Sequence, residues 1–139
     1  MTTDEQFPII CSRVAPSRRA VILPHYAGHH MLTLERLIYQ AMREYAPDYQ
    51  GGCWIMWELS NGGFYMAPGG RDETYSMQCV GNWFDDTMSA DAAGIVACLV
   101  AFNRLAWHTR HQRFIDLYHQ LRDFALEHDE ATKIMAAID

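Results

Sequence analysis

The short stretch WELSNGGFYMAP, from Trp57 to Pro68, constrains the fold more than any other part of the sequence. It places Asn-Gly-Gly between two aromatic-rich runs, and alternating runs that flank Asn-Gly are typical of a β-hairpin. A type I′ turn needs positive φ at both central residues, and Asn61 and Gly62 reach it at low energetic cost. We therefore expect a two-residue turn.

The two-residue turn would fix which side chains share a face of the hairpin. Leu59 then lies opposite Phe64 and Trp57 opposite Met66, while Gly63 ends the turn. This register makes one face wholly apolar, whereas a three-residue loop would mix the two sets of side chains, so we expect the apolar face to form the core. The second face comprises Trp54, Met56, Glu58 and Tyr65. Either helices cover it or it forms an exposed patch, and we expect coverage.

The residues around the hairpin predict a larger sheet. The turn sequences SNGG and GGRDE separate three strand-like runs, Cys53 to Leu59, Phe64 to Pro68 and Thr74 to Val80. Consecutive runs joined by short turns predict a three-stranded antiparallel meander. The N-terminal stretch FPIICSRV is expected to add a short strand, and APSRRAVILP is expected to form one or two helical turns.

Helices are predicted on both sides of the strands. Thr33 is expected to cap an amphipathic helix that ends before Pro47. Ser89 is a suitable N-cap for a helix from Ala90 to about Trp107. Because this second helix is apolar on all sides, we expect it to be the buried centre of the fold.

Two more helices are predicted towards the C-terminus. The helix from Arg113 to His128 has one apolar and one acidic face, and Asp129 is expected to cap a last short helix. The order of elements predicts an α+β fold, with a small antiparallel sheet of three to four strands and about four to five helices. We expect residues 1–139 to form a single domain.

The composition is typical of a chain that folds alone, because 50% of the 139 residues are hydrophobic and 20% are charged. The longest apolar run, Ala92 to Phe102, is about half of the ~20 residues that a bilayer crossing needs, so we expect no membrane helix. Asp4 and Glu5 stand where a secretion signal would carry basic residues, which predicts a cytoplasmic location. The four cysteines form no CxxC pair, and we expect buried free thiols.

Three neighbouring histidines, His25, His29 and His30, raise the question of a metal site, because imidazoles four residues apart on a helix share a face. Gly28 interrupts such a helix, and no carboxylate or thiol stands at a supporting spacing. We therefore expect neither a metal nor another cofactor. The sequence also has no nucleotide-binding, zinc-protease or nucleophile-elbow motif, which favours a protein without catalytic activity.

The segment RLAWHTRHQRF gathers Arg104, Arg110, Arg113 and two histidines in a chain of net charge −6. Cations stabilise helix C-termini, so a solvated helix cap is the simplest interpretation. A contact with phosphate or with an acidic partner is the alternative.

The acidic face of the helix from Arg113 to His128 raises the possibility of DNA mimicry. Asp116 to Glu127 spans ~16 Å of helix, a length over which duplex DNA carries roughly ten charges. The three carboxylates on that face, Asp116, Asp123 and Glu127, fall well short of such a row. We therefore expect neither a DNA-like surface nor strong DNA binding.

Three blocks of the sequence resemble one family. YQGGCWIMWELSNGGFYMAP resembles the signature region of the ArdB/KlcA family of antirestriction proteins. MSADAAGIVACLVAFNRLA resembles the central helix of that family, and LYHQLRDFALEHDEATKIMAAID resembles its C-terminal helices in order and spacing. The resemblance is nearly continuous from Tyr49 onward and looser before it.

The resemblance implies a small cytoplasmic α+β protein, carried by plasmids and other mobile elements, that protects incoming DNA by inhibiting host type I restriction. The family is not regarded as a DNA mimic and has no established catalytic residues, so no active site is implied. The expected partner is a type I restriction enzyme or an associated host factor, with direct contact left open. A monomer or a weak dimer fits equally well.

Charged residues in turns and at helix ends are the candidate partner contacts: Arg71, Asp72, Glu73, Asp85, Asp86, Arg104, Arg110 and Arg113. Two alternatives remain from the residues themselves. The first is a small metal-dependent or nucleic-acid-processing enzyme that uses the histidines or the arginine segment. The second is a passive binding module that docks through Trp54, Met56 and Tyr65, which requires those side chains to be exposed.

Overall fold

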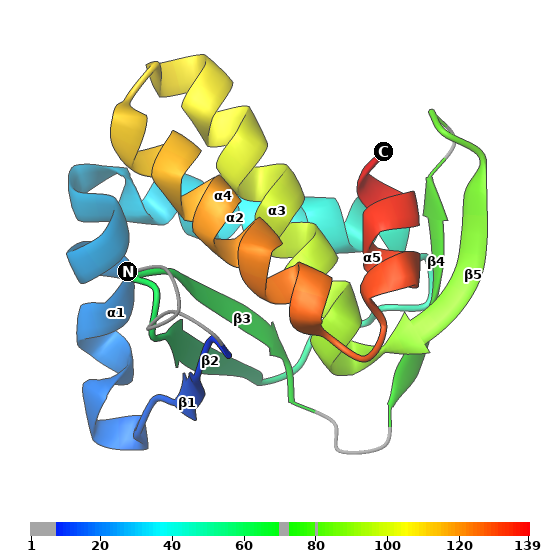
Figure 1. The fold of residues 1–139 in the computed structure, drawn as a ribbon, viewed down its shortest axis with the longest axis horizontal. Helices are drawn as coiled ribbons and strands as arrows, with labels where there is room; N and C mark the ends of the chain where they lie inside the picture. Colours follow the sequence, from blue (N-terminus) through cyan, green and yellow to red (C-terminus); the bar gives the residue numbers. More distant parts are fainter. Residues whose placement is uncertain (1–7, 70–72, 80) are drawn as a thin grey trace.

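The computed structural model describes residues 8–69, 73–79 and 81–139, which form an α+β fold (Figure 1). The strands are β1 (Cys11–Arg13), β2 (Trp54–Leu59), β3 (Phe64–Pro68), β4 (Thr74–Cys79) and β5 (Phe84–Ser89). The α-helices are α1 (Arg19–Ala27), α2 (Met31–Tyr45), α3 (Ala90–Thr109), α4 (Gln112–Glu127) and α5 (Ala131–Ile138). Two 3₁₀ turns, η2 (Pro16–Arg18) and η3 (Gly28–His30), precede α1 and α2. The predicted α+β class is confirmed.

The described strands form two antiparallel sheets, one in the order β1-β2-β3 and one that pairs β4 with β5. The predicted meander is therefore wrong, because its third strand pairs with β5 and not with β3. The reason is that α3 packs against the outer edge of β3 and occupies the place of a further strand. Val80, the predicted end of the third strand, lies outside the described residues.

The hairpin between β2 and β3 has a three-residue loop, which corrects the predicted two-residue turn. The amide of Leu59 donates to the carbonyl oxygen of Gly63 at 2.9 Å, and the amide of Gly62 donates to Leu59 at 3.1 Å. Gly62 has φ +96°, whereas Asn61 is not among the residues with positive φ. This pattern matches hairpins that close with a left-handed glycine after a turn.

The register is consequently one residue away from the predicted one. Met56 lies opposite Met66, Trp57 opposite Tyr65, and Glu58 opposite Phe64. The predicted pairs of Leu59 with Phe64 and of Trp57 with Met66 are therefore wrong. The predicted wholly apolar face is also wrong, because the observed register places Phe64 and Met66 on the same face as Glu58.

The prediction of the register failed because both faces of the sheet are covered. Trp54, Met56 and Tyr65 are only 3%, 5% and 2% exposed. Tyr39 of α2 packs edge-on against Trp54 with ring centroids 5.1 Å apart, and Phe124 of α4 stacks on Tyr65 at 5.8 Å. The three side chains are buried as expected, although the observed register places Tyr65 on the face opposite to Trp54 and Met56. Their burial excludes the docking role.

Helix α3 runs through the centre of the molecule, with α2 and α4 on either side of it (Figure 1). Ser89 caps it as predicted, since its Oγ accepts a hydrogen bond from the amide of Ala92 at 3.1 Å. Among the described helices, α3 alone has the length and hydropathy of a membrane span, and most of it is buried inside the fold. Its apolar sequence is thus explained by packing.

Gly94 allows α3 to approach β3 very closely. A Cβ atom placed on Gly94 would lie 2.3 Å from Ala67 Cβ and 2.7 Å from the carbonyl oxygen of Met66. Real Cβ atoms do not tolerate such distances, so any side chain at this position would push the helix away from the strand.

Several predicted helix starts need correction. Helix α2 begins at Met31, so Thr33 lies inside it and caps nothing. Glu130 precedes α5 without a side-chain cap, so the predicted capping role of Asp129 is wrong. The segment expected to form one or two turns is the nine-residue helix α1, which continues through Pro24.

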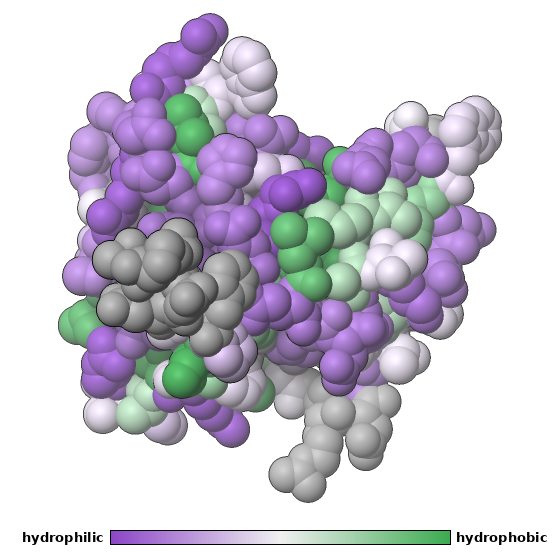
Figure 2. Space-filling model, viewed as in Figure 1, coloured by the Kyte–Doolittle hydropathy of each residue, from purple (hydrophilic) through white to green (hydrophobic). Residues whose placement is uncertain are grey.

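The face seen in Figure 2 is mostly hydrophilic, with a hydrophobic area where α5 adjoins α3.

The cysteines partly match the expectation of buried free thiols. All four are free, and Cys98 is buried, whereas Cys53 is exposed.

Candidate functional site

The end of α3 divides the arginine segment between two helices. α3 ends at Thr109, and Arg110 follows in the left-handed region with φ +61°, where its amide donates to the carbonyl oxygen of Ala106 at 2.8 Å. α4 then begins at Gln112. Arg104, Arg110 and Arg113 therefore point in different directions although they lie within ten residues of one another in the sequence.

Arg104 is bound to a neighbouring helix. Its guanidinium donates to the carboxylate of Glu44 on α2 at 2.8 Å, and both side chains are about 40% exposed. The hydrogen bond from Arg104 lowers the pKa of Glu44. An exposed pair of this kind contributes at most about 1 kcal/mol.

Arg113 caps a helix, but not the one that the sequence suggested. Its guanidinium donates to the carbonyl oxygens of Tyr26 and His25 at 2.7 Å each, and both belong to the last turn of α1. A cation at this position satisfies orphan carbonyl groups and complements the helix dipole. Arg113 therefore caps α1, whereas the sequence predicted a solvated cap at the end of the helix that begins at Ala90.

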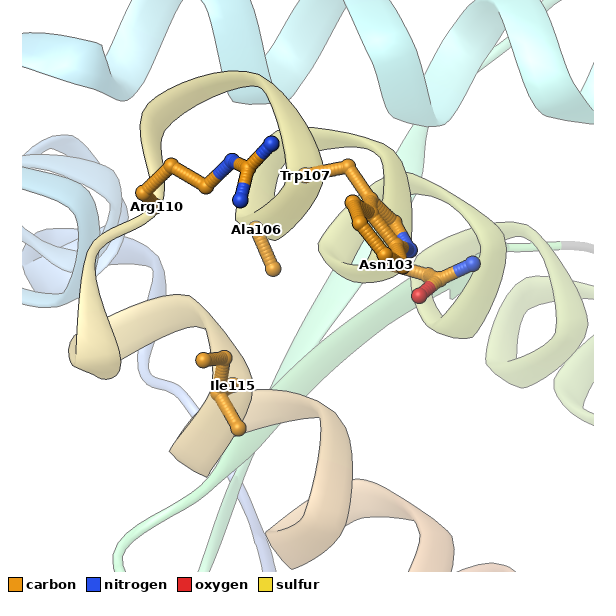
Figure 3. Close-up of a pocket in the computed structure, with 5 residues that line it drawn as sticks. All are labelled: Asn103, Ala106, Trp107, Arg110 and Ile115. Atoms are coloured by element: carbon orange, nitrogen blue, oxygen red, sulfur yellow. The ribbon is translucent and has the colours of Figure 1, made fainter.

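Arg110 forms one wall of an open groove at the end of α3. Figure 3 shows Trp107, Ala106 and Asn103 on α3, Arg110 directly after its end, and Ile115 facing them from α4. The groove has a volume of about 300 Å³. The guanidinium of Arg110 lies over the indole of Trp107, 5.5 Å from its centroid, and Trp107 is 67% exposed.

The predicted histidine group is extended by a fourth histidine, His111, which directly precedes α4. His29 and His30 have ring centroids 4.0 Å apart, and His111 lies 5.4 Å from His30. Together with His25 and Arg113 they line an open pocket of about 570 Å³. Within the described part of the chain, no three His, Cys, Asp or Glu side chains are arranged to hold a metal ion.

His30 lies in an environment that is unfavourable for a charged imidazole. Its Nε2 is buried without a hydrogen-bond partner among the described residues. Desolvation lowers the pKa of His30, and the neighbouring His29, His111 and His108 lower it further. The pocket thus disfavours protonation of this imidazole.

A polar network at the start of α3 was not predicted. Asp91 accepts hydrogen bonds from Tyr65 at 2.7 Å and pairs with His128 Nε2 at 2.8 Å. This hydrogen bond to Asp91 raises the pKa of His128, and burial raises the pKa of Tyr65. No local signal identifies this network, because its members lie 26 and 37 residues apart in the chain.

The same network includes a serine but does not form a nucleophilic triad. The hydroxyl of Ser89 donates to Glu130, and the amide of Ser89 donates to the same carboxylate at 3.0 Å. In the neutral imidazole, the Nδ1 of His128 accepts from the amide of Glu130 at 2.9 Å. Both imidazole nitrogens are therefore engaged away from Ser89, whereas nucleophilic catalysis needs a base beside the hydroxyl. The network ties α3, β5 and the α4–α5 junction together.

The other sequence candidates that the structure describes lie apart from the end of α3. Glu73 accepts a hydrogen bond from the hydroxyl of Tyr75 at 2.8 Å. Asp85 is exposed, and Asp86 lies 3.8 Å from the ammonium group of Lys133. Arg71 and Asp72 lie outside the described residues. The structure thus does not bring the predicted contacts into one site.

Comparisons with known proteins agree with the resemblance seen in the sequence. The family described as "Antirestriction protein" matches residues 47–139. Two antirestriction proteins KlcA from Escherichia coli are 44% and 42% identical to this chain over 99% and 100% of both lengths. The uncharacterised protein YafX from Escherichia coli (strain K12) is 36% identical over 96% of this chain and 90% of its own length.

A solved structure gives the same result in three dimensions. It is 42% identical and has a TM-score of 0.88, covering 95% of this chain and 96% of the solved one. It belongs to work on KlcA and ArdB, which describes a novel fold and antirestriction activity against type I DNA restriction systems in vivo but not in vitro. The present chain belongs to the antirestriction protein family that includes KlcA.

Proposed function

We propose that this protein inhibits host type I restriction-modification, so that incoming plasmid or mobile-element DNA escapes cleavage. The observation that carries the proposal is the likeness over the whole length to KlcA, at 44% identity in sequence and a TM-score of 0.88 to the solved structure.

Inhibition without catalysis fits the polar clusters. Ser89 is engaged by Glu130, and the imidazole of His128 is engaged by Asp91 and by a backbone amide. Side chains bound in this way stabilise the junction of helices and are not free to attack a substrate. We therefore propose that the protein acts through contacts in the cytoplasm with a type I restriction enzyme or with an associated host factor.

Inhibition without DNA mimicry fits the acidic residues of α4. Asp116 accepts a hydrogen bond from Gln112 at 2.9 Å, and Glu127 accepts one from the amide of Ile9 at 3.0 Å. Only Asp123 of that face has no such bond among the described contacts. Duplex DNA carries roughly ten charges over the same ~16 Å of helix, so this face does not reproduce a row of phosphates.

Phage plating in living cells tests the proposal. Unmodified phage is plated on a type I restricting host with and without the protein, and expression is verified by immunoblot. We expect the protein to raise the titre of unmodified phage towards that of phage already modified by the host. Unchanged restriction at good expression would contradict the proposal, and modified phage controls for effects on growth or adsorption.

A host with a type II system serves as a second control. Type II enzymes cut at their recognition site without ATP-driven translocation, so an inhibitor of type I systems should not protect phage there. Equal protection in both hosts would instead indicate a general effect on DNA entry or stability.

A further inference from the structure

We propose that the groove between Trp107, Arg110 and Ile115 binds an acidic protein segment that inserts one large apolar side chain. This inference rests on the proposed function, because it names the surface through which the protein would contact its partner in restriction. It commits to a protein ligand, and it places the apolar anchor between Trp107 and Ile115 and a carboxylate at Arg110.

Trp107 is the first reason for this assignment. It lies in the last turn of α3 and is 67% exposed, so its indole contributes little to the core of this chain. Ile115 faces it from α4 and is 37% exposed, so the two side chains form an apolar cleft open to solvent (Figure 3). Exposed Trp beside Arg is the combination that dominates the energetics of protein interfaces.

The local charge is the second reason, because it selects an acidic occupant. Residues 103 to 115 contain no Asp or Glu, although the whole chain has seventeen acidic residues against eleven basic ones. Glu44 neutralises Arg104 in this stretch, so the charge that lines the groove is that of Arg110, which has no carboxylate partner among the described ion pairs. A cation without a carboxylate partner beside an apolar cleft attracts a negatively charged segment.

Nucleic acid fits the groove less well than a protein segment does. Arg110 already lies over the face of the Trp107 indole, which is the face that a base would need for stacking. Arg104 is paired with Glu44, and Arg113 is bound to the carbonyl groups of α1. A row of free cations that could follow a phosphate backbone is therefore lacking in the groove.

The chain offers well-matched variants for a test. Trp107→Gln removes the aromatic wall of the groove at an exposed position, and Arg110→Glu reverses the charge while keeping a non-glycine residue at φ +61°. Trp83→Gln is the control, because Trp83 is 87% exposed and lies in the turn between β4 and β5, away from the groove. Unchanged far-UV circular dichroism would confirm that all three variants are folded.

Binding is measured by NMR titration of the full chain with three probes. They are a short peptide of Asp and Glu with one central Leu, the same peptide with Ser in place of Leu, and a thymidine oligonucleotide of equal charge. We expect the Leu peptide to shift the Trp107 indole and the Ile115 amide, leaving the Trp83 indole unchanged. Trp107→Gln and Arg110→Glu should each weaken binding by about tenfold or more, and added salt should weaken it as well.

Three outcomes of the titration would overturn the assignment. They are an absence of shifts at Trp107 and Ile115, equal affinity for the Leu and Ser peptides, and tighter binding of the oligonucleotide. The last outcome would identify a nucleic-acid site.

Phage plating with the same variants separates this inference from the proposed function. We expect the wild type and Trp83→Gln to relieve restriction, and Trp107→Gln and Arg110→Glu to lose relief. If the wild type and Trp107→Gln relieve restriction equally, the groove is not the functional contact and the proposed function stands. If the wild type gives no relief, the proposed function fails and the titration alone decides whether the groove binds acidic segments.

Discussion

The thiol of Cys98 on α3 hydrogen-bonds both polar groups of Met66 on β3. Its Sγ lies 3.4 Å from the amide nitrogen, which donates to it, and 3.4 Å from the carbonyl oxygen, to which it donates. Met66 lies opposite Met56, and the carbonyl oxygen of Met56 is directed towards Val14 in the β1 segment. The polar groups of Met66 therefore point away from the sheet, and α3 satisfies an edge that would otherwise recruit another strand.

Replacement of this thiol should destabilise the protein measurably. Cys98→Ala leaves two buried backbone groups of Met66 without a partner, and we expect a loss of about 1–3 kcal/mol in the free energy of unfolding. Cys98→Ser retains a donor and an acceptor, so its loss should be smaller. Urea denaturation measures both. Equal stability of the wild type and the Ala variant would show that the thiol contributes nothing to the edge.

Gly94→Ala tests the close approach of α3 to the same strand. Helix propensity alone favours Ala over Gly by about 1 kcal/mol. The new Cβ would lie 2.5 Å from Ala67 Cα, which is backbone and cannot rotate away. We therefore expect destabilisation of about 3 kcal/mol in thermal or urea unfolding. Gly81→Ala is the control, since nothing lies within 4 Å of its added Cβ, and a stabilised Gly94→Ala would refute the packing described.

Two substitutions, one that removes a glycine and one that introduces a glycine, test the conformation of the hairpin loop. Gly62→Ala forces a side chain into φ +96°, and we expect a cost of about 1–2 kcal/mol. Asn61→Gly removes a hydrogen bond from Asn61 Nδ2 to the carbonyl oxygen of Gln120 at 2.9 Å and another from the amide of Gly63 at 3.1 Å, so it should also destabilise the fold. In a two-residue turn Asn61 would itself need positive φ, and Asn61→Gly would stabilise instead.

The pair formed by His128 and Asp91 should make stability depend on pH. The pKa of His128 is raised above its ordinary value of 6.5, so the folded chain binds the proton more tightly than the unfolded chain does. The stabilisation is fully present below about pH 6.5 and is lost as pH rises through the raised pKa. His128→Gln should therefore destabilise the protein more at acidic pH than at alkaline pH, as measured by urea denaturation.

Asp91→Asn provides the control for this pH dependence. It removes the carboxylate that holds the proton on His128, so the difference from the wild type should also shrink as pH rises. A constant difference across the range would show that the pair does not titrate with folding.

The elements predicted correctly are those whose signal lies within one segment. α3 follows from Ser89 and a continuous apolar run, and the apolar stripe of α4 matches Phe114, Leu117, Leu121 and Ala125, all of which are buried. The prediction of the hairpin register failed because both faces of the hairpin are buried, so the alternation of apolar residues could not identify a single core face. The strand β5 was missed because its Asp85, Asp86 and Thr87 are exposed and its pairing with β4 is visible only in three dimensions.

The sequence located the arginines of the candidate site along the chain, but it did not predict their arrangement in space. The sequence identified Arg104, Arg110 and Arg113, but the end of α3 at Thr109 sends them to three different places. The groove beside Trp107 depends on Ile115 of the next helix, and the network of Asp91 with Tyr65 and His128 joins three distant segments. Such contacts arise from tertiary packing, which local pattern does not encode.

Relief of restriction is most directly measured by transformation of a type I restricting host with two unmodified plasmids that differ only in recognition sites. The plasmid without sites corrects for uptake and for cell viability. We expect expression of this protein to bring the yield of transformants with the site-bearing plasmid up to that of the site-free plasmid. A ratio that stays as low as in cells without the protein, at verified expression, would contradict its assignment as an inhibitor of type I restriction.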